Sequence, residues 1–292
     1  MKKLIFAGVL ITAVFIPIAV SEGQVMPVCS IIEENPTISK ENNNTVINEE
    51  LENYVVGVVA GEMPVNFPHE AIKAQAVAAR TYAVRQINTN PSIKYEDIDQ
   101  AYVTVEKMKK MWGDNFETHY NKIKNDVYST AGQIIEYENE PILAAFCSTT
   151  NGYTEECVNV WTQDLPYLKS VKSDGDELSP YYNDNVTISK SRFINIFGST
   201  SVSNIEKTPA GYVKSLTIGG KIYEGSEIRK ILGLKSNSFD ISISGENIVI
   251  NTKGFGHGVG MSQYGACYMA NSGKTYIEIL SHYYKGTNIK NL

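Results

Sequence analysis

A single carboxylate, Glu62, stands at the expected end of an apolar helix, a position suited to acid–base chemistry. The helix is predicted over residues 51–62 because its apolar residues recur at helical spacing, and Pro64 should end it close to Glu62. Lost hydration and the negative end of a helix both favour a protonated carboxyl, which can act as a general acid. Because most helix-end glutamates are solvated, the simpler interpretation is that Glu62 caps the helix or pairs with Lys73 or Arg80.

A second helix is predicted over residues 70–84, where polar side chains interrupt a small and apolar sequence. These polar residues are Gln75, Arg80, Thr81 and Tyr82. Polar groups on a buried helix need hydrogen-bond partners. Two interpretations follow: they bind the carbonyl groups of loops, or some of them face a cleft beside Glu62.

A glycine-rich segment, residues 253–266, is the second place where chemistry is expected. Glycine occupies every second position from 254 to 260, and the polar residues among and after these glycines are His257, Ser262, Gln263 and Tyr264. Glycine allows backbone conformations that are closed to other residues, and it lets a ligand approach the main chain. The spacing is not that of a nucleotide-binding loop. The segment is therefore either a tight turn with an interior histidine or a ligand-binding loop.

The surrounding elements predict an α+β fold, with mixed helices and antiparallel hairpins around one cleft, because strands and helices do not alternate regularly. Further helices are expected at residues 105–116, 120–130, 189–197, 225–232, 259–271 and 275–284. Hairpins are expected at 132–148, 211–223 and 239–252, with short strands at 167–171 and 185–188.

Composition and the N-terminus restrict the class of protein. The 292 residues carry a net charge of −6, with a pI near 5.4, which argues against a nucleic-acid partner held by charge. Lys2 and Lys3 precede an uncharged run, residues 4–20, which favours an uncleaved membrane anchor over a cleaved signal peptide. We therefore predict an anchor at residues 1–21, a polar linker at 22–48 and a domain at 49–292 that a single membrane span holds outside the cell.

The four cysteines lack the spacing of a zinc or redox motif. They are Cys29, Cys147, Cys157 and Cys267. Free structural thiols are the favoured interpretation, and a bridge between Cys147 and Cys157 across a hairpin stays open. A cysteine hydrolase that uses Cys147 with His257 is a weaker hypothesis, because no activating signature surrounds this cysteine.

Several separated motifs resemble, in the same order, the stage II sporulation protein D family, which includes enhancers of cell-wall amidases. The motifs lie at residues 59–64, 73–83, 146–155, 160–168, 253–266 and 281–287. They extend over nearly everything from 51 to 289. The number of motifs and their shared order make the resemblance specific, and it implies that residues 49–292 form a catalytic domain of this type.

The resemblance implies a lytic transglycosylase that cleaves peptidoglycan during endospore engulfment. In such enzymes one carboxyl protonates the glycosidic oxygen between N-acetylmuramic acid and N-acetylglucosamine. The resulting carboxylate accepts the proton of the muramyl 6-hydroxyl, which leaves a 1,6-anhydro sugar. The family's catalytic glutamate matches Glu62. A lone carboxyl fits this chemistry better than that of hydrolytic glycosidases, which need a pair.

The resemblance also implies partners and a glycan cleft. The expected partners are glycan strands stripped of their peptides, the amidase known as stage II sporulation protein P and a multi-spanning membrane protein. The residues expected to line the cleft are Gln75, Arg80, Ser148, Thr150, His257, Gln263 and Tyr264. Some family members bind zinc, but residues 97–102, which match part of that site, contain neither His nor Cys, so no metal or other cofactor is expected. The alternative function is a non-catalytic amidase enhancer that binds glycan.

Overall fold

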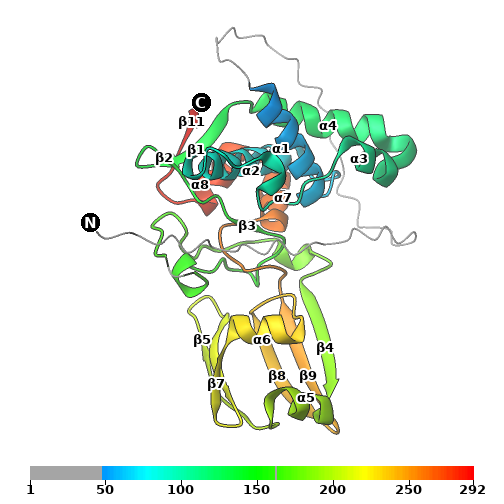
Figure 1. Ribbon diagram of the computed structural model, residues 1–292, viewed down its shortest axis with the longest axis vertical. Coiled ribbons are helices and arrows are strands. Elements are labelled where there is room, and N and C mark those ends of the chain that lie inside the picture. The colour runs from blue at the N-terminus through cyan, green and yellow to red at the C-terminus, as the bar shows by residue number, and fades with distance from the viewer. Residues whose placement is uncertain (1–47, 162) are drawn as a thin grey trace.

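The computed structural model describes residues 48–161 and 163–292, which form two units, one above the other in Figure 1. Each unit has its own hydrophobic cluster. Residues 51–168 and 259–284 build the first cluster, and residues 188–250 build the second. We call these the helical unit and the sheet unit. The structure is therefore mixed α+β, as predicted, but with two cores.

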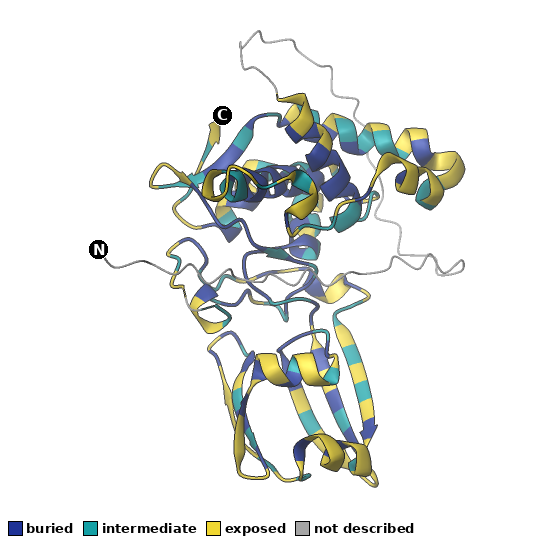
Figure 2. Ribbon diagram, viewed as in Figure 1, coloured by how far each residue is buried: buried dark blue, intermediate teal, exposed yellow. Residues whose placement is uncertain are grey.

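Helix α2 lies at the centre of the helical unit and packs against α1, α4, α7 and α8 (Figure 1). The helices of this unit are α1 (Glu49–Glu62), α2 (His69–Thr89), α3 (Val105–Trp112), α4 (Phe116–Ser129), α7 (Gln263–Asn271) and α8 (Tyr276–Tyr283). Short 3-10 helices lie at Tyr95–Asp97, Gly113–Asn115, Cys157–Asn159 and Asp176–Leu178. Figure 2 shows α1 and α2 mostly in the colour of buried residues, which fits their apolar sequences.

Two small strand groups complete the helical unit. Strand β1 (Gln133–Tyr137) lies between β11 (Asn288–Asn291) and β2 (Glu140–Pro141) in an antiparallel sheet. Strand β3 (Phe146–Cys147) pairs in parallel with β10 (Met261–Ser262). The parallel pair ties the glycine-rich segment to the chain around Cys147.

The sheet unit consists of two antiparallel three-stranded sheets and two helices around a small core. One sheet has the order β4 (Asn183–Ser189), β9 (Asn247–Lys253), β8 (Phe239–Ser244), and the other β5 (Val202–Lys207), β6 (Val213–Ile218), β7 (Lys221–Glu224). The helices are α5 (Lys190–Phe197) and α6 (Gly225–Leu232). The predicted hairpins β6–β7 and β8–β9 are confirmed, and so are both helices.

Helix α1 forms where its sequence predicts, for local reasons. The Asn48 side chain accepts a hydrogen bond from the Leu51 N–H at 3.2 Å and so caps the first turn. After Glu62 the chain turns extended at Met63, with φ −125°, as expected for a residue before proline. Glu62 is therefore the last helical residue.

Several sequence predictions are wrong where long-range pairing decides the structure. The hairpin predicted over residues 132–148 is confirmed only in its first part, where β1 pairs antiparallel with β2 around residues 138–139. Its second arm does not continue, because residues 142–145 are irregular and β3 pairs with β10. The predicted strand at 167–171 is irregular chain. Helix α7 starts at Gln263, since residues 259–262 form a bend and strand β10. Strands β5 and β11 were not predicted.

The predicted anchor at 1–21 lies outside the described residues, as does nearly all of the linker at 22–48. Within residues 48–161 and 163–292, no helix combines the length and hydropathy that crossing a bilayer requires.

Candidate active site

A cavity of about 780 Å³ lies where the two units meet, and both units contribute to its walls. The helical unit supplies side chains from the end of α1, from α2, from the loop at residues 99–101 and from the chain around β3. The sheet unit supplies the exposed side of α6 and the residues just after it. The residues of the cavity used below are Glu62, Asp99, Phe146, Cys147, Ser148, Trp161, Glu227, Arg229, Lys230, Asn237, Gly256, His257 and Gln263.

Glu62 lies in the cavity wall with one hydrogen bond to its carboxylate. The Ala101 N–H donates to Glu62 Oε1 at 2.9 Å. Burial raises the pKa of Glu62 to about 7; the bond from Ala101 opposes this rise, and the Asp99 carboxylate adds to it. A large fraction of Glu62 is therefore protonated near neutral pH, which agrees with the acid–base interpretation and not with the simpler one.

Neither cation that was considered as a partner neutralises Glu62. Lys73 Nζ lies 2.7 Å from Glu70, and Arg80 Nη2 lies 2.6 Å from Glu52. The salt-bridge interpretation of Glu62 is therefore wrong. Its carboxyl is left to face the cavity.

Two glycines of α1 bring the loop at residues 99–103 into contact with Glu62. A side-chain carbon on Gly61 would lie 2.5 Å from the Ala101 carbonyl oxygen, and one on Gly57 would lie 2.2 Å from the Tyr102 ring. The Val103 N–H also donates to the Gly57 carbonyl at 3.1 Å. This close packing holds the Ala101 N–H in place for the carboxylate. Glycines four residues apart on an apolar helix were the sequence signal for it.

Gln263 joins the end of α1 to the glycine-rich segment. Its Nε2 donates to the Glu62 main-chain carbonyl at 2.9 Å, across 201 positions of sequence. Ser262 caps α7 by accepting from the Gly265 N–H, so Gln263 is the first residue of that helix. The bond fixes the C-terminal end of α1, where the last carbonyls of a helix lack partners.

His257 presents a neutral imidazole to the cavity. Burial and the positive charge of Arg229 lower the pKa of His257 to about 3, against a backbone hydrogen bond at Phe146. Nδ1 accepts from the Val259 N–H at 3.0 Å, so the ring proton lies on Nε2. The centroid of the His257 ring lies 5.0 Å from the centroid of the Trp161 ring. His257 is therefore a neutral, positioned side chain rather than an acid.

The alternating glycines serve mainly to bring two chain segments together. Gly256 and Gly260 have φ of +119° and +77°, a region that favours glycine. A side-chain carbon on Gly260 would lie 1.9 Å from the Ala145 carbonyl oxygen, and one on Gly256 would lie 2.7 Å from Cys147 Cβ. The close approach predicted for a ligand is thus occupied largely by the protein's own backbone.

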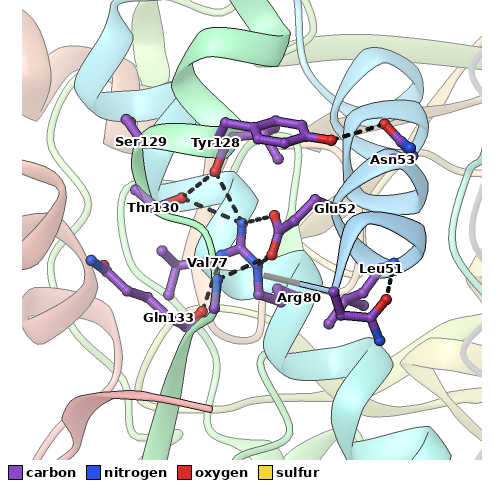
Figure 3. Close-up of polar contacts among 12 residues, drawn as sticks. Leu51, Glu52, Asn53, Val77, Arg80, Tyr128, Ser129, Thr130 and Gln133 are labelled. Atoms are coloured by element: carbon purple, nitrogen blue, oxygen red, sulfur yellow. Dashed lines mark hydrogen bonds and ion pairs between the residues drawn. The ribbon is translucent and has the colours of Figure 1, made fainter. Parts of the chain in front are cut away.

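Ser148, His257 and Gln263 lie with Glu62 around the cavity, whereas the other four expected lining residues lie elsewhere. Arg80 is a correction: its side chain is fully buried, and its guanidinium donates to Glu52 and to the Gln133 and Val127 carbonyls (Figure 3). Its charge is used to hold the helical unit together and does not reach the cleft.

Gln75, Thr150 and Tyr264 also lie away from the cavity. Gln75 is fully buried, and its amide has no hydrogen-bond partner among the residues that the structure describes. The buried Thr150 hydroxyl donates to the Asp176 carboxylate. The Tyr264 ring packs edge-on against the Phe67 ring, with 5.1 Å between the ring centroids. For these three residues the structure shows packing roles, because the elements that carry them turn these side chains away from the opening.

The cysteines in the described chain do not form a catalytic or bridged pair. Cys147 and Cys157 are both buried free thiols, so the disulfide left open by the sequence is not formed. Burial raises the pKa of the Cys147 thiol well above its usual value and keeps it protonated. The cysteine-hydrolase hypothesis therefore lacks an activated nucleophile. No cluster of three or more His, Cys, Asp or Glu suited to a metal ion occurs in residues 48–161 and 163–292.

The sheet unit's contribution to the site was missed by sequence reasoning. Arg229, Lys230 and Asn237 line the same cavity as Glu62 but follow it by more than 160 positions. For Asp99 the sequence indicates only that its segment, residues 97–102, contains neither His nor Cys. No local pattern marks these residues, because their proximity to Glu62 depends on how the two units pack.

Comparison with known proteins identifies a family model and several relatives that match this chain. The family model described as "Stage II sporulation protein" matches residues 39–137. The chain is 45% identical over 261 residues to "Stage II sporulation protein D" of Bacillus subtilis (strain 168), covering 85% of this chain and 76% of that protein. It is 44% identical to the protein of the same name from Bacillus amyloliquefaciens, covering 88% and 80%.

A more distant relative carries a different name. The chain is 28% identical to the "Amidase enhancer" of Bacillus subtilis (strain 168), covering 80% of this chain and 40% of that protein. The class is thus that of sporulation proteins related to an amidase enhancer. The chain belongs to the stage II sporulation protein D family.

Proposed function

We propose that the protein is a peptidoglycan lytic transglycosylase in which Glu62 is the acid and the base. The observation that carries the proposal is a carboxyl with a pKa of about 7 that no cation neutralises, in the wall of a cavity of about 780 Å³ between two units. A cavity of this size can hold several atoms on either side of a sugar linkage. The role of Glu62 in the family's motif supports the same assignment.

The proposed reaction needs one proton donor that becomes a proton acceptor. Protonated Glu62 gives its proton to the glycosidic oxygen that follows N-acetylmuramic acid, and the bond between that oxygen and muramyl C1 breaks. The Glu62 carboxylate then takes the proton of the 6-hydroxyl, whose oxygen attacks C1 of the same sugar. The products are a 1,6-anhydro muramyl end and a free N-acetylglucosamine end, and no water is consumed.

Neighbouring groups prepare Glu62 for both steps. The Ala101 N–H stabilises the carboxylate that remains after the first transfer, and burial favours the protonated form before it. The opposing effects keep the pKa of Glu62 near neutral, where a group can both donate and accept. Gln263 holds the backbone that carries the carboxyl.

Product analysis with Glu62→Gln tests the proposal. We expect the wild-type protein to release 1,6-anhydro muramyl products from peptide-free glycan strands, and the variant to be slower by about 10²–10⁴-fold, the usual contribution of a general acid. Thermal unfolding should show that the variant is folded. Glu117→Gln, on the exposed first turn of α4, is the matched control and should act like wild type.

Two other outcomes of this experiment would contradict the proposal in different ways. Reducing muramyl ends would indicate hydrolysis, for which another carboxylate of the cavity, such as Asp99, could supply the base. Binding of glycan with no cleavage would indicate the alternative function, a non-catalytic amidase enhancer. The relative named as an amidase enhancer gives that alternative its support.

We further propose the cellular setting that the family relationship suggests. The protein would be anchored in the cell membrane by one span, with residues 49–292 outside, and would act during endospore engulfment. It would follow the amidase stage II sporulation protein P, together with a multi-spanning membrane protein. Microscopy of sporulating cells carrying Glu62→Gln tests this: engulfment should stall, and normal engulfment would contradict the proposal.

A further inference from the structure

The loop at residues 99–103 has no regular secondary structure, although its Ala101 N–H donates to the Glu62 carboxylate at 2.9 Å. A loop keeps a main-chain group in one direction only where other contacts hold it, because ordering the backbone costs conformational entropy. The bond from the Val103 N–H to the Gly57 carbonyl holds the chain after Ala101. The chain before Ala101 requires a contact of its own.

The Gln100 side chain makes that contact by joining the loop to both central helices. Its Oε1 accepts from the Tyr54 hydroxyl of α1 at 3.0 Å, and its Nε2 donates to the Ala79 carbonyl of α2 at 3.4 Å. An amide bonded through both its oxygen and its nitrogen keeps one orientation, since turning it over would break both bonds. The peptide group that follows Gln100 carries the Ala101 N–H, so restricting Gln100 also restricts the direction of that donor.

Tyr54 is itself held by two aromatic rings of the same segment. The centroid of its ring lies 4.8 Å from that of Tyr95 and 5.6 Å from that of Tyr102, and both pairs are stacked. These two tyrosines stand before and after Gln100 in the sequence. Burial raises the pKa of Tyr54 above its usual value, so its hydroxyl stays protonated. Tyr54 is therefore a donor with a fixed direction.

Helix α1 carries both Tyr54 and Glu62, eight residues apart. This spacing corresponds to about 12 Å along the helix axis. The loop at residues 99–103 makes hydrogen bonds to Tyr54, to Gly57 and to Glu62. Because a helix keeps its residues at constant spacing, a contact at Tyr54 can define where the loop lies at Glu62.

We propose that Tyr54 and Gln100 are positioning residues that direct the Ala101 N–H at the Glu62 carboxylate. The inference rests on the proposed function for its effect on the reaction, whereas the contact itself can be tested without turnover. When Glu62 gives up its proton, this donor is already in place to stabilise the negative oxygen, and nothing has to be reorganised. Both residues act through Ala101 and not on the sugar.

Uncharged substitutions separate this contact from the charges near Glu62. The titratable side chains near Glu62 come from α1, from α2, from the loop, from the chain around β3, from the glycine-rich segment and from α6. They are Tyr54, Tyr82, Asp99, Cys147, His257, Glu227, Arg229 and Lys230. Tyr54→Phe and Gln100→Met alter none of these charges, because Tyr54 is protonated where Glu62 titrates. A change in the pKa of Glu62 in either variant therefore reports on the bond from Ala101.

A titration of Glu62 tests the proposal. The full chain is labelled with ¹³C at its glutamate carboxyl carbons, and the signal that Glu62→Gln removes is the signal of Glu62. Weakening a hydrogen bond to the carboxylate should raise the pKa of Glu62 in Gln100→Met by on the order of one pH unit, and in Tyr54→Phe in the same direction. An unchanged or lowered pKa in both variants would overturn the proposal.

A double variant tests whether Tyr54 and Gln100 act through one contact. Tyr54→Phe combined with Gln100→Met should raise the pKa of Glu62 no further than Gln100→Met alone. Additive effects would overturn the link between the two residues. If Gln100→Met does not fold, Tyr54→Phe still reports whether the hydroxyl positions the donor.

Tyr128→Phe is the matched control, because it removes a similar bond from the same helix at another place. The Tyr128 hydroxyl donates to Asn53 Oδ1 at 3.1 Å, one residue before Tyr54 (Figure 3). This variant should leave the pKa of Glu62 at the wild-type value. A rise as large as that in Tyr54→Phe would indicate a general loosening of α1 and would overturn the assignment.

Amide hydrogen exchange adds a local measurement that a loss of overall stability would not reproduce. The Ala101 N–H should exchange faster in Tyr54→Phe than in the wild-type protein. The Met63 N–H, which donates to the Val59 carbonyl at 3.0 Å, should keep its protection. Equal acceleration at Ala101 and Met63 would indicate opening of the end of α1 and would overturn the positioning role.

Kinetics distinguish this inference from the proposed reaction. In Tyr54→Phe the decline of activity with rising pH should move to higher pH, and kcat should fall by up to about tenfold with KM within about twofold. If the wild-type protein forms no anhydro ends, the proposed function fails, while the titration of Glu62 still tests the positioning role. If anhydro ends form and the pKa of Glu62 is the same in all variants, only the positioning role fails.

Discussion

The two ends of helix α1 each carry a glutamate, Glu52 buried and Glu62 half-buried, and their surroundings differ. At the N-terminal end, the Glu52 carboxylate accepts from Arg80 Nε at 2.9 Å, Arg80 Nη2 at 2.6 Å and the Gly132 N–H at 3.0 Å (Figure 3). At the C-terminal end, the Glu62 carboxylate accepts one bond, from the Ala101 N–H, and faces a cavity. One carboxylate is compensated by a cation, and the other is not.

The difference distinguishes the Glu52 carboxylate, which is part of an ion pair within the fold, from the Glu62 carboxyl, which is free to exchange a proton. Arg80 connects α1 to α2, and its bonds to the Val127 and Gln133 carbonyls extend this link to α4 and β1. Such a pair contributes little over an apolar pair but is costly to break. Glu62 is left with a raised pKa of about 7, and its environment disfavours the charged form. The same residue type on one helix therefore stabilises the fold at one end and, in the function we propose, supplies acid–base chemistry at the other.

Removing the charge of Glu52 should give the largest effect. Glu52→Gln leaves the fully buried Arg80 without its counter-charge, so the free energy of unfolding should fall by about 3–5 kcal/mol. Denaturant unfolding at pH 8 measures it, with Glu50→Gln on the exposed first turn of α1 as the control. A double variant, Glu52→Leu with Arg80→Met, should recover much of the loss. A loss below 1 kcal/mol would show that the pair is not essential to the fold.

The same substitution at Glu62 should have the opposite sign. Because the pKa of Glu62 rises from 4.5 to about 7 on folding, the folded state binds the proton more tightly, and wild-type stability falls as pH rises through that window. At about 1.4 kcal/mol per pKa unit, Glu62→Gln should stabilise the protein by on the order of 3 kcal/mol at pH 8. At pH 4 both proteins carry a neutral group, so their stabilities should agree. Destabilisation at pH 8 would remove the contrast between the two glutamates.

Loss of the Gln263 bond should have a smaller effect that falls mainly on activity. Gln263→Ala removes the donor to the Glu62 carbonyl, which should lower the free energy of unfolding by about 1 kcal/mol. Displacement of the carboxyl should slow the proposed glycan cleavage by about tenfold. Asn271→Ala, at the exposed far end of α7, is the control for this helix. Unchanged cleavage by Gln263→Ala would show that this bond does not position Glu62.

The smallest effect should come from Asp99, whose charge raises the pKa of Glu62. Activity that needs protonated Glu62 should decline as pH rises through about 7. Asp99→Asn removes a nearby negative charge, so this decline should move to lower pH. Added salt should act in the same direction, since Asp99 is exposed. The pH profile of product release measures both, with Asp97→Asn as the control, and a shift to higher pH would contradict the assigned cause.

Local patterns predicted much of the fold. Helix α1 follows from apolar spacing and Pro64, and the β6–β7 and β8–β9 hairpins follow from glycine turns between β-rich runs. The pairings β1–β11 and β3–β10 could not be predicted, because their partners lie more than 100 positions away and the strands are short. The existence of two hydrophobic cores could not be predicted either, because it too depends on contacts between segments that are remote along the chain.

The candidate site also contains some residues that the sequence predicts and others that it does not. The raised pKa of Glu62 could be predicted because the helical spacing places this carboxyl among apolar side chains. Arg80 was assigned to the cleft because a polar residue on a buried helix requires a partner, and the sequence does not identify that partner as Glu52. Arg229 and Asn237 carry no local signal, since their place in the cavity depends on the packing of the sheet unit.

The amino-acid sequence by itself determined that Glu62 ends an apolar helix and that a glycine-rich segment leads into another helix. Both depend on interactions between residues a few positions apart. Only the tertiary structure decided which carboxylate of α1 has a cation beside it and which faces a cavity. Charge compensation depends on distances of a few ångströms between segments that are remote along the chain, and these are set by the packing of whole units.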